Sequence, residues 1–416
     1  MSWAASLRLI IWVRGLGFSK VNSVFNYGFY GASALAGSIS SFFLTSAMIW
    51  AFIRTGFRHF PLRTDFRLRV VALLFALYPA SEIISVLANG RSINGLIECG
   101  GSLLALAILP VASRLLLSSP QDISNSAGRG AAIGGIVTLI YCVIQFVFLD
   151  YQRPEGGSGN ASVLAYYALV LWCLCYCLLP VVDNEFRNLL KIGALCCLGA
   201  IILSSTRAVW IATLCAGAVM AWQMRSALLR SLINIALFWK LLFAATILPA
   251  AAYLVFQRVK MTVDSFNTAG IASTDISISS RLIMWRGGWA QFEMSPFFGY
   301  GPDSTREMIA ALGGDAPLSY SHYHNIFLTA AIRGGRVEVT AIVFIFCALG
   351  WFALKKSNDQ FETAGRTLIL AVGIASFVSG MANVIFTHDI TNAMFIYTII
   401  VGLCLGISKT PPAKKP

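Results

Sequence analysis

The sequence predicts an all-α polytopic membrane protein with about 12 transmembrane helices. Of its 416 residues, 57% are apolar and only 12% are charged, whereas soluble domains carry about 25% charged residues. The mean hydropathy is +0.73. Basic residues lie at the ends of the apolar runs, where membrane topology is encoded. We therefore attribute the net charge of +13 to orientation in a membrane and expect no nucleic-acid partner.

Apolar runs close to the ~20 residues that cross a bilayer recur along the whole chain. Every second gap between them is basic, which predicts that those gaps face the cytoplasm. Because Arg8, Arg14 and Lys20 place the N-terminus on that side too, parity requires a twelfth span before residue 53. The eleven recognisable runs are 25–53, 70–88, 93–113, 131–149, 161–182, 188–206, 208–224, 236–256, 337–354, 367–387 and 391–408.

The chain is expected to form a single bundle with one long loop. Residues 1–256 and 324–408 supply the transmembrane helices, residues 257–323 form an extracytoplasmic loop, and residues 409–416 form a short cytoplasmic tail. The first twenty residues carry no small-residue cleavage site, so we keep them as mature protein. The ten cysteines all fall in apolar runs, where they are expected to be buried small hydrophobes and not metal ligands.

The residue pattern within the long loop predicts a short amphipathic helix. Leu282, Trp285, Trp289 and Phe292 recur at helical spacing in SRLIMWRGGWAQF, which predicts a helix with its tryptophans at the level of the lipid headgroups. The turn-forming stretch SPFFGYGPDS follows. Its residues that stop the helix are Gly299, Gly301 and Pro302.

The stretch SYSHYHNIFLTAAIRGG concentrates histidine at the outer side of the predicted bundle. His322 and His324 lie in it, and His388 maps to the same side. If Asn325 begins the next helix, His324 and Gly335 share a helical face, and the glycine lets a neighbouring helix approach closely. A histidine at a membrane boundary can simply occupy the interface, but three of four on one side favour a function.

Two arginines are candidates for binding phosphate. Arg207 is the only charge between Lys191 and Arg225, and Ser204, Ser205 or Thr206 could cap the helix that follows it. A guanidinium at a helix N-terminus suits an anion. The serine pair before Arg281 repeats this arrangement. Either arginine could instead reach towards headgroups.

The remaining polar residues give no pattern typical of a metal or cofactor site. No DxD, HExxH or P-loop motif occurs and the outer carboxylates are scattered, so we expect no divalent metal and no cofactor, which makes arginine the available neutraliser of a diphosphate. Glu82 and Glu98 lie within apolar spans. They mark either an ion path or hydrogen bonds between helices.

These motifs resemble the O-antigen ligase and polymerase superfamily. In that family a histidine is followed by Asn, Ser or Gln, nine residues and a glycine, and HNIFLTAAIRGG supplies His324, Asn325 and Gly335. SSTR resembles the family's serine-arginine signature at Arg207, and SSRLIMW…SPFFGYGP resembles its loop motif at Arg281. The family pattern has a small residue or tyrosine where this chain has Glu338. The resemblance covers about the second half of the chain.

The resemblance implies a GT-C-like glycosyltransferase of the bacterial inner membrane with a periplasmic active site. The donor would be O-antigen glycan on a polyprenyl (undecaprenyl) diphosphate, and the acceptor a sugar hydroxyl of lipid A-core. His324 would be the general base, and Arg207 and Arg281 would hold the diphosphate in a metal-independent, inverting displacement. Further substrate contacts are expected from Asn325, His322, Tyr323 and Arg286, and structural roles from Gly335, Gly299 and Gly301.

Three other functions stay open at this point. An O-antigen polymerase and a protein O-oligosaccharyltransferase belong to the same superfamily, and the short C-terminal tail favours the ligase. A transporter or flippase for lipid-linked glycan belongs to a different class. Transporters concentrate polar groups near the bilayer midplane, whereas the histidines and arginines here gather at one side. Membrane lipids are expected partners in every case.

Overall fold

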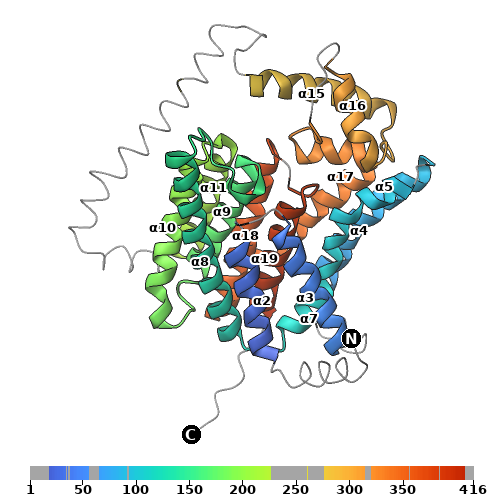
Figure 1. The fold of residues 1–416 in the computed structure, drawn as a ribbon. Helices are drawn as coiled ribbons and strands as arrows, with labels where there is room; N and C mark the ends of the chain where they lie inside the picture. The colour runs from blue at the N-terminus through green and yellow to red at the C-terminus, as the bar shows by residue number, and fades with distance from the viewer. Residues whose placement is uncertain are drawn as a thin grey trace, which may run out of the picture.

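The computed structural model describes residues 18–33, 35, 38–55, 65–90, 93–225, 260, 276–313, 320–355, 357–383 and 385–407. The span expected at 236–256 and the tail 409–416 lie outside this part. All regular elements within it are helices (Figure 1). Eight are long and apolar enough to cross a membrane, and Ile39–Ile53 is a shorter apolar helix. The chain is therefore an all-α polytopic membrane protein, as predicted.

The helices of the first half surround the core, except α9 (Ala161–Leu178), which is largely buried within it. The others are α2 (Phe18–Ala32), α3 (Ile39–Thr55), α4 (Phe66–Ala88), α5 (Ile93–Glu98), α6 (Gly100–Leu103), α7 (Ile108–Leu115), α8 (Pro120–Phe148), α10 (Arg187–Leu203) and α11 (Arg207–Gln223). The run expected at 25–53 is divided into α2 and α3; neither is among the eight helices long and apolar enough to cross a membrane, so the twelfth span that parity required stays a prediction.

The second half contributes two helices at one end of the bundle and three within it. They are α15 (Ile276–Met294), α16 (Thr305–Ala311), α17 (Ile326–Ala353), α18 (Gln360–Gly380) and α19 (Asp389–Ile407). Helices α15 and α16 lie across the end of the bundle at the top of Figure 1.

Several helix starts follow from short polar side chains that satisfy free backbone amides. Asp65 accepts from Arg67 N before α4, and Ser119 accepts from Asp122 N before α8. Asn160 does the same for α9, Asn325 for α17 and Asp359 for α18. Such caps contribute about 1 kcal/mol each. Asn325 therefore begins the helix that the sequence placed there.

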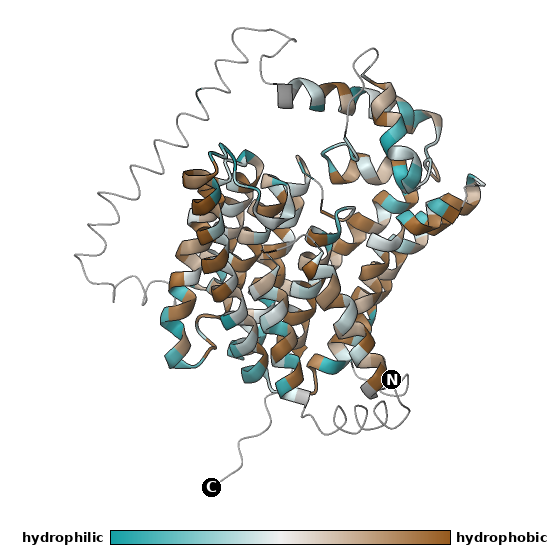
Figure 2. Ribbon diagram, viewed as in Figure 1, coloured by the Kyte–Doolittle hydropathy of each residue, from teal (hydrophilic) through white to brown (hydrophobic). Residues whose placement is uncertain are grey.

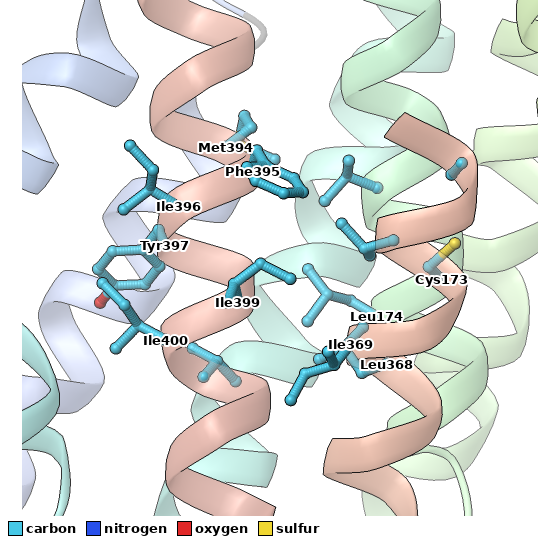
Figure 3. Packing of buried hydrophobic residues seen from close by; sticks show 14 of the residues in the cluster. Cys173, Leu174, Leu368, Ile369, Met394, Phe395, Ile396, Tyr397, Ile399 and Ile400 are labelled. Atoms are coloured by element: carbon cyan, nitrogen blue, oxygen red, sulfur yellow. The ribbon is translucent and has the colours of Figure 1, made fainter. Parts of the chain in front are cut away.

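Helix α19 forms the centre of the core. Its span is 94% buried, and it is hydrophobic all round, as a central helix must be. Side chains of α9, α18 and α19 interdigitate, and Cys173 lies among them as a buried small hydrophobe (Figure 3). The span of α8 is only 39% buried, so much of its apolar surface faces outward. Figure 2 shows apolar residues along the helices and polar ones concentrated at the ends.

The two ends of the bundle collect different loops. Arg67 lies 3.7 Å from Glu362, and Gln121 donates to the carbonyl oxygen of Val181 at 2.9 Å, so several basic gaps meet at one end. At the other end the loops before α9, α11, α17 and α19 converge. Thr206 there donates to the carbonyl oxygen of Ala161. The alternation of basic gaps along the sequence thus corresponds to two distinct ends in space.

One buried ion pair joins α4 to α17. Arg333 donates through Nε at 2.8 Å and lies with Nη2 at 2.7 Å from the same oxygen of Glu82, and both side chains are buried. Of the two roles expected for Glu82, an ion path or a hydrogen bond between helices, the structure shows the hydrogen bond. Glu98 is exposed at the end of α5. Glu338, the departure from the family pattern, is fully buried on α17.

Helix α15 packs on the bundle through a small apolar cluster. Met284 of α15 meets Ile309, Tyr323 and Ile332, with Trp285 and Phe292 partly buried against them. Trp289 is exposed. The Trp285 indole N–H donates to the carbonyl oxygen of Tyr323 at 2.8 Å and its ring is partly buried against the protein, so the headgroup level expected for both tryptophans stays a prediction.

Candidate active site

Helix α17 is interrupted at Gly335, where the backbone is left-handed at φ 67°. The loop after α15 fills the break: Tyr300 N donates to Ile332 O at 2.7 Å and Gly301 N donates to Arg333 O at 2.9 Å. A Cβ atom on Gly335 would lie 2.2 Å from the carbonyl oxygen of Phe297. The expected close approach is present, but the neighbour is a loop and not a helix.

Gly299 completes this contact from the loop side. Its φ is +63°, and a Cβ atom there would lie 2.4 Å from the carbonyl oxygen of Ile332. Gly301 has φ 91° and precedes the short turn at Pro302–Ser304. The two backbones can approach this closely only because neither carries a side chain at the crossing.

His324 lies just outside α17. It adopts φ 50°, and Asn325 follows it as the N-cap, accepting from Phe327 N and Leu328 N at 3.0 Å each. The expectation that His324 shares a helical face with Gly335 is wrong, because left-handed backbone turns the imidazole off the helix and Gly335 itself breaks the helix. The rings of Tyr320 and His322 pack edge-on against His324, with centroids 5.3 and 4.4 Å away.

His324 and Arg281 line the same cavity. We call it the cationic cavity; its volume is about 290 Å³ and it opens at the end of the bundle below α15. Two further charged groups, Arg153 and Glu155, come from the loop before α9. The lining residues are Arg153, Glu155, Gly159, Asn160, Ala161, Ser162, Arg281, Met284, Tyr320 and His324.

A second, smaller cavity adjoins the first. We call it the neutral cavity; its volume is about 20 Å³, and it brings His322, His324 and His388 together. Asn160, Ser162 and His324 line both cavities, so His324 stands at their boundary. The remaining lining residues of the neutral cavity are Val163, Tyr166, Ser379 and Asn383.

Burial favours the neutral form of all three imidazoles. Burial, together with the charge of Arg281, lowers the pKa of His324 to about 4. Burial lowers the pKa of His322 to about 3, with smaller contributions from His324, His388 and Arg281. Burial also lowers the pKa of His388, against the opposing effect of Asp389. A neutral imidazole has one nitrogen free to accept a proton.

Arg207 occupies the first position of α11, and Thr206 is its N-cap. The Thr206 side chain makes no capping bond to the helix, contrary to expectation. Arg153 instead reaches this turn, donating to Ser204 O and Thr206 Oγ1 at 3.4 Å each. Arg207 thus lies in the loop cluster beside the cationic cavity but is not one of the residues that line it.

Three further predicted contact residues lie away from both cavities. Tyr323 is fully buried beneath α15 and its hydroxyl donates to Gln291, so it supports the loop from behind. Asn325 uses its side chain as the cap and donates to Met381 O at 3.3 Å. Arg286 is exposed on α15. Tyr323 is turned away from the cavities because successive side chains in this segment point to opposite sides. Its neighbours His322 and His324 line the neutral cavity, and Tyr323 points into the protein.

Sequence reasoning missed three residues that the structure brings to the cavities, Arg153, Asn160 and Asn383, and it placed His388 on the correct side without a role. Asn160 precedes an apolar run, which is a recognisable cap signal. Arg153 was visible only as one charge in a weakly charged gap. Nothing in the local sequence of Asn383 indicates that α18 ends beside the HYH stretch.

The fold and the cavities define a class: a polytopic membrane protein with a cationic cavity and a neutral cavity at one end of its helical bundle. Residues 192–337 match the family model described as O-antigen ligase, and this match supports membership of the O-antigen ligase/polymerase superfamily. The matched segment contains Arg207, Arg281, His324 and Gly335, whereas Arg153 and His388 lie outside it. No curated protein matches the chain.

Proposed function

We propose that the protein is an O-antigen ligase, a glycosyltransferase that moves O-antigen glycan from undecaprenyl diphosphate to a sugar hydroxyl of lipid A-core. The family supports a transferase that uses lipid-linked glycans. The observation that carries the proposal for this chain is that His324 and Arg281 line one cavity although they come from separate segments.

His324 is the proposed general base. The nucleophile is a sugar hydroxyl, which attacks efficiently only as its proton is removed. The imidazole is neutral because burial and Arg281 lower its pKa to about 4. A bound diphosphate would offset the charge of Arg281 and so raise the pKa of His324 towards its usual value. Substrate binding would thereby strengthen the base at the point where it is needed.

Arg281, Arg153 and Arg207 are the proposed partners of the diphosphate. Fixed guanidinium groups stabilise the charge that develops on a leaving diphosphate, and they bind its oxygens in a bidentate manner. Arg281 and Arg153 line the cationic cavity, and Arg207 lies at the adjacent helix start. With these groups the reaction needs no divalent metal in our proposal. Displacement by the acceptor itself predicts inversion at the anomeric carbon.

We further propose that the protein acts in the bacterial inner membrane with this end facing the periplasm. The support is the alternation of basic gaps, which assigns the opposite end to the cytoplasm. Maleimide labelling of Arg306→Cys, at an exposed position, in a protein whose ten native cysteines have been replaced would show which side of the membrane this end faces. Labelling by a membrane-impermeant reagent only after disruption of the inner membrane would contradict this orientation.

The test of the activity is reconstitution of the purified protein with lipid-linked glycan and competing acceptors. We expect transfer to lipid A-core that EDTA does not inhibit. Preferential extension of one lipid-linked glycan by another would identify a polymerase, and transfer to protein an oligosaccharyltransferase. Donor recovered chemically unchanged in the presence of every acceptor would favour a transporter. Inhibition by EDTA that Mg²⁺ or Mn²⁺ reverses would contradict the metal-free mechanism.

A further inference from the structure

The two cavities differ in charge although they share a wall. The cationic cavity contains two guanidinium groups and one carboxylate. Among the described residues that line it, the neutral cavity has no Lys, Arg, Asp or Glu side chain and offers amides, hydroxyls and imidazoles instead. Neutral donors and acceptors of this kind hydrogen-bond a hydroxyl group, whereas a diphosphate requires positive charge. The two compartments are therefore suited to two different parts of a reacting pair.

Polar atoms at the neutral cavity are available to a ligand. The Nδ1 atoms of His324 and His388 are buried and accept or donate no hydrogen bond among the described residues. Oδ1 of Asp389 lies 3.4 Å from Nδ1 of His388, an ion-pair contact only when the imidazole is protonated. Asn383 donates one N–H to Ser379 at 3.3 Å, and its second N–H and its carbonyl oxygen can bond a ligand. A buried polar atom without a partner is costly, and a bound hydroxyl would satisfy it.

The neutral cavity is also too small for a sugar ring. It measures about 20 Å³, and by the same measure a single water needs about 10–15 Å³. A hydroxyl or hydroxymethyl group can enter it. A phosphate or a whole sugar cannot, so the rest of an acceptor would remain outside.

We propose that the neutral cavity receives the attacking hydroxyl of the acceptor, with Asn383 and His388 as positioning residues, while the donor diphosphate occupies the cationic cavity. This inference rests on the proposed glycosyl transfer. His324, on the shared wall, faces both partners. The acceptor O–H bond breaks and its proton passes to His324. The oxygen then bonds to the anomeric carbon, and the bond from that carbon to the diphosphate oxygen breaks, leaving its electron pair on the diphosphate.

The test separates the two substrates by steady-state kinetics. Asn383→Leu keeps the size of the side chain and removes its hydrogen bonds. We expect the KM for lipid A-core to rise about 2- to 10-fold, as for the loss of one or two hydrogen bonds, while the KM for the lipid-linked donor stays within about 2-fold. His388→Gln makes the same comparison independently, in case Asn383→Leu fails to fold.

Asn188→Leu is the matched control, because Asn188 is exposed at the far end of α10. It should change neither KM. A rise in the donor KM equal to that for the acceptor, or no change in either, would overturn the assignment of the neutral cavity while leaving glycosyl transfer intact. Absence of transfer by the unsubstituted protein to any glycan acceptor would overturn both this inference and the proposed function.

Discussion

Trp285 donates its indole N–H to the carbonyl oxygen of Tyr323 at 2.8 Å, and this bond ties α15 to the residue that precedes His324. Arg281 lies one turn earlier on α15. The position of the guanidinium relative to the imidazole is therefore set by backbone and indole contacts and by the apolar cluster around Met284. Two chain segments that the sequence separates are held as one rigid end of the bundle.

Substitution of Arg281 should lower activity with the donor more than it lowers the stability of the fold. Arg281→Ala removes a charge-assisted contact to the diphosphate, so we expect kcat/KM for the donor to fall about 10- to 100-fold. Arg281→Lys should recover only part of this, because an ammonium lacks the planar fork. Arg306→Ala, an exposed arginine on the neighbouring α16, is the control and should be close to normal. Equal effects of Arg281→Ala and Arg306→Ala would rule out a specific role.

Gly335 should be intolerant of any side chain. Gly335→Ala forces left-handed backbone on alanine and sets Cβ against the Phe297 carbonyl, so we expect a loss of roughly 1–3 kcal/mol or more in stability. The apparent thermal midpoint in detergent would report it. Gly350→Ala, in the same helix with open space around the new Cβ, should be neutral or slightly stabilising. Equal midpoints for the two variants would show that the break is not needed.

The buried pair of Glu82 and Arg333 should be strongly coupled. Arg333→Met leaves the Glu82 carboxylate buried without its partner, which typically costs 3–5 kcal/mol. Glu82→Leu combined with Arg333→Met removes both charges and should regain most of that loss. A double-mutant cycle on thermal midpoints measures the coupling. Additive losses in the double variant would mean that the pair does not stabilise the fold.

The departure from the family pattern at Glu338 belongs to the same region. Both of its carboxylate oxygens are buried without a hydrogen-bond partner among the described residues. The family motif alone marks Glu338 as unusual. The structure adds that its carboxylate interacts electrostatically with the ion pair of Glu82 and Arg333. The pattern predicted a small residue or tyrosine; the structure offers no hydrogen-bonding explanation for the carboxylate.

Folded stability should decline on mild acidification. The pKa of His324 is lowered to about 4 and that of His322 to about 3 in the folded protein, whereas the unfolded value is ~6.5. The unfolded state therefore binds more protons below pH 6.5. The stability is fully present above ~6.5 and is lost progressively as the pH falls from there towards the folded values.

The corresponding measurement is the apparent thermal midpoint at one heating rate between pH 7 and pH 5. We expect a fall on the order of a few °C. The variant His322→Asn combined with His324→Asn should show a smaller fall, since neither asparagine titrates. The same slope in both proteins would assign the acid sensitivity to other groups.

The sequence predicted the fold class and the start of α17 at Asn325 because both depend on local properties. Hydropathy along the chain identifies spans, and Asn325 is a cap by its own chemistry. The site was only partly predictable for the same reason. His324 and Arg281 stand in recognisable local motifs, but Arg153, Asn383 and His388 reach the cavities through the packing of α9, α18 and α19.

The local conformation around the HNIFLTAAIRGG motif was also not readable from spacing alone. A regular helix from Asn325 through Gly335 was the natural expectation for an apolar run. Three backbone hydrogen bonds join this break to residues 296–301: Tyr300 N and Gly301 N donate to α17, and Arg336 N donates to the carbonyl oxygen of Pro296. Likewise, Trp289 is exposed while Trp285 faces the protein, because α15 packs on Tyr323 and Ile332 and not only on a membrane surface.

The most direct measurement is the turnover of purified His324→Ala in reconstituted transfer of glycan from the lipid-linked donor to lipid A-core. A general base contributes about 10²- to 10⁴-fold, so kcat should fall by at least about 100-fold while the variant still inserts and binds donor. Transfer at a near-normal rate by a well-inserted His324→Ala protein would contradict the assignment of His324 as the base and, with it, the central claim.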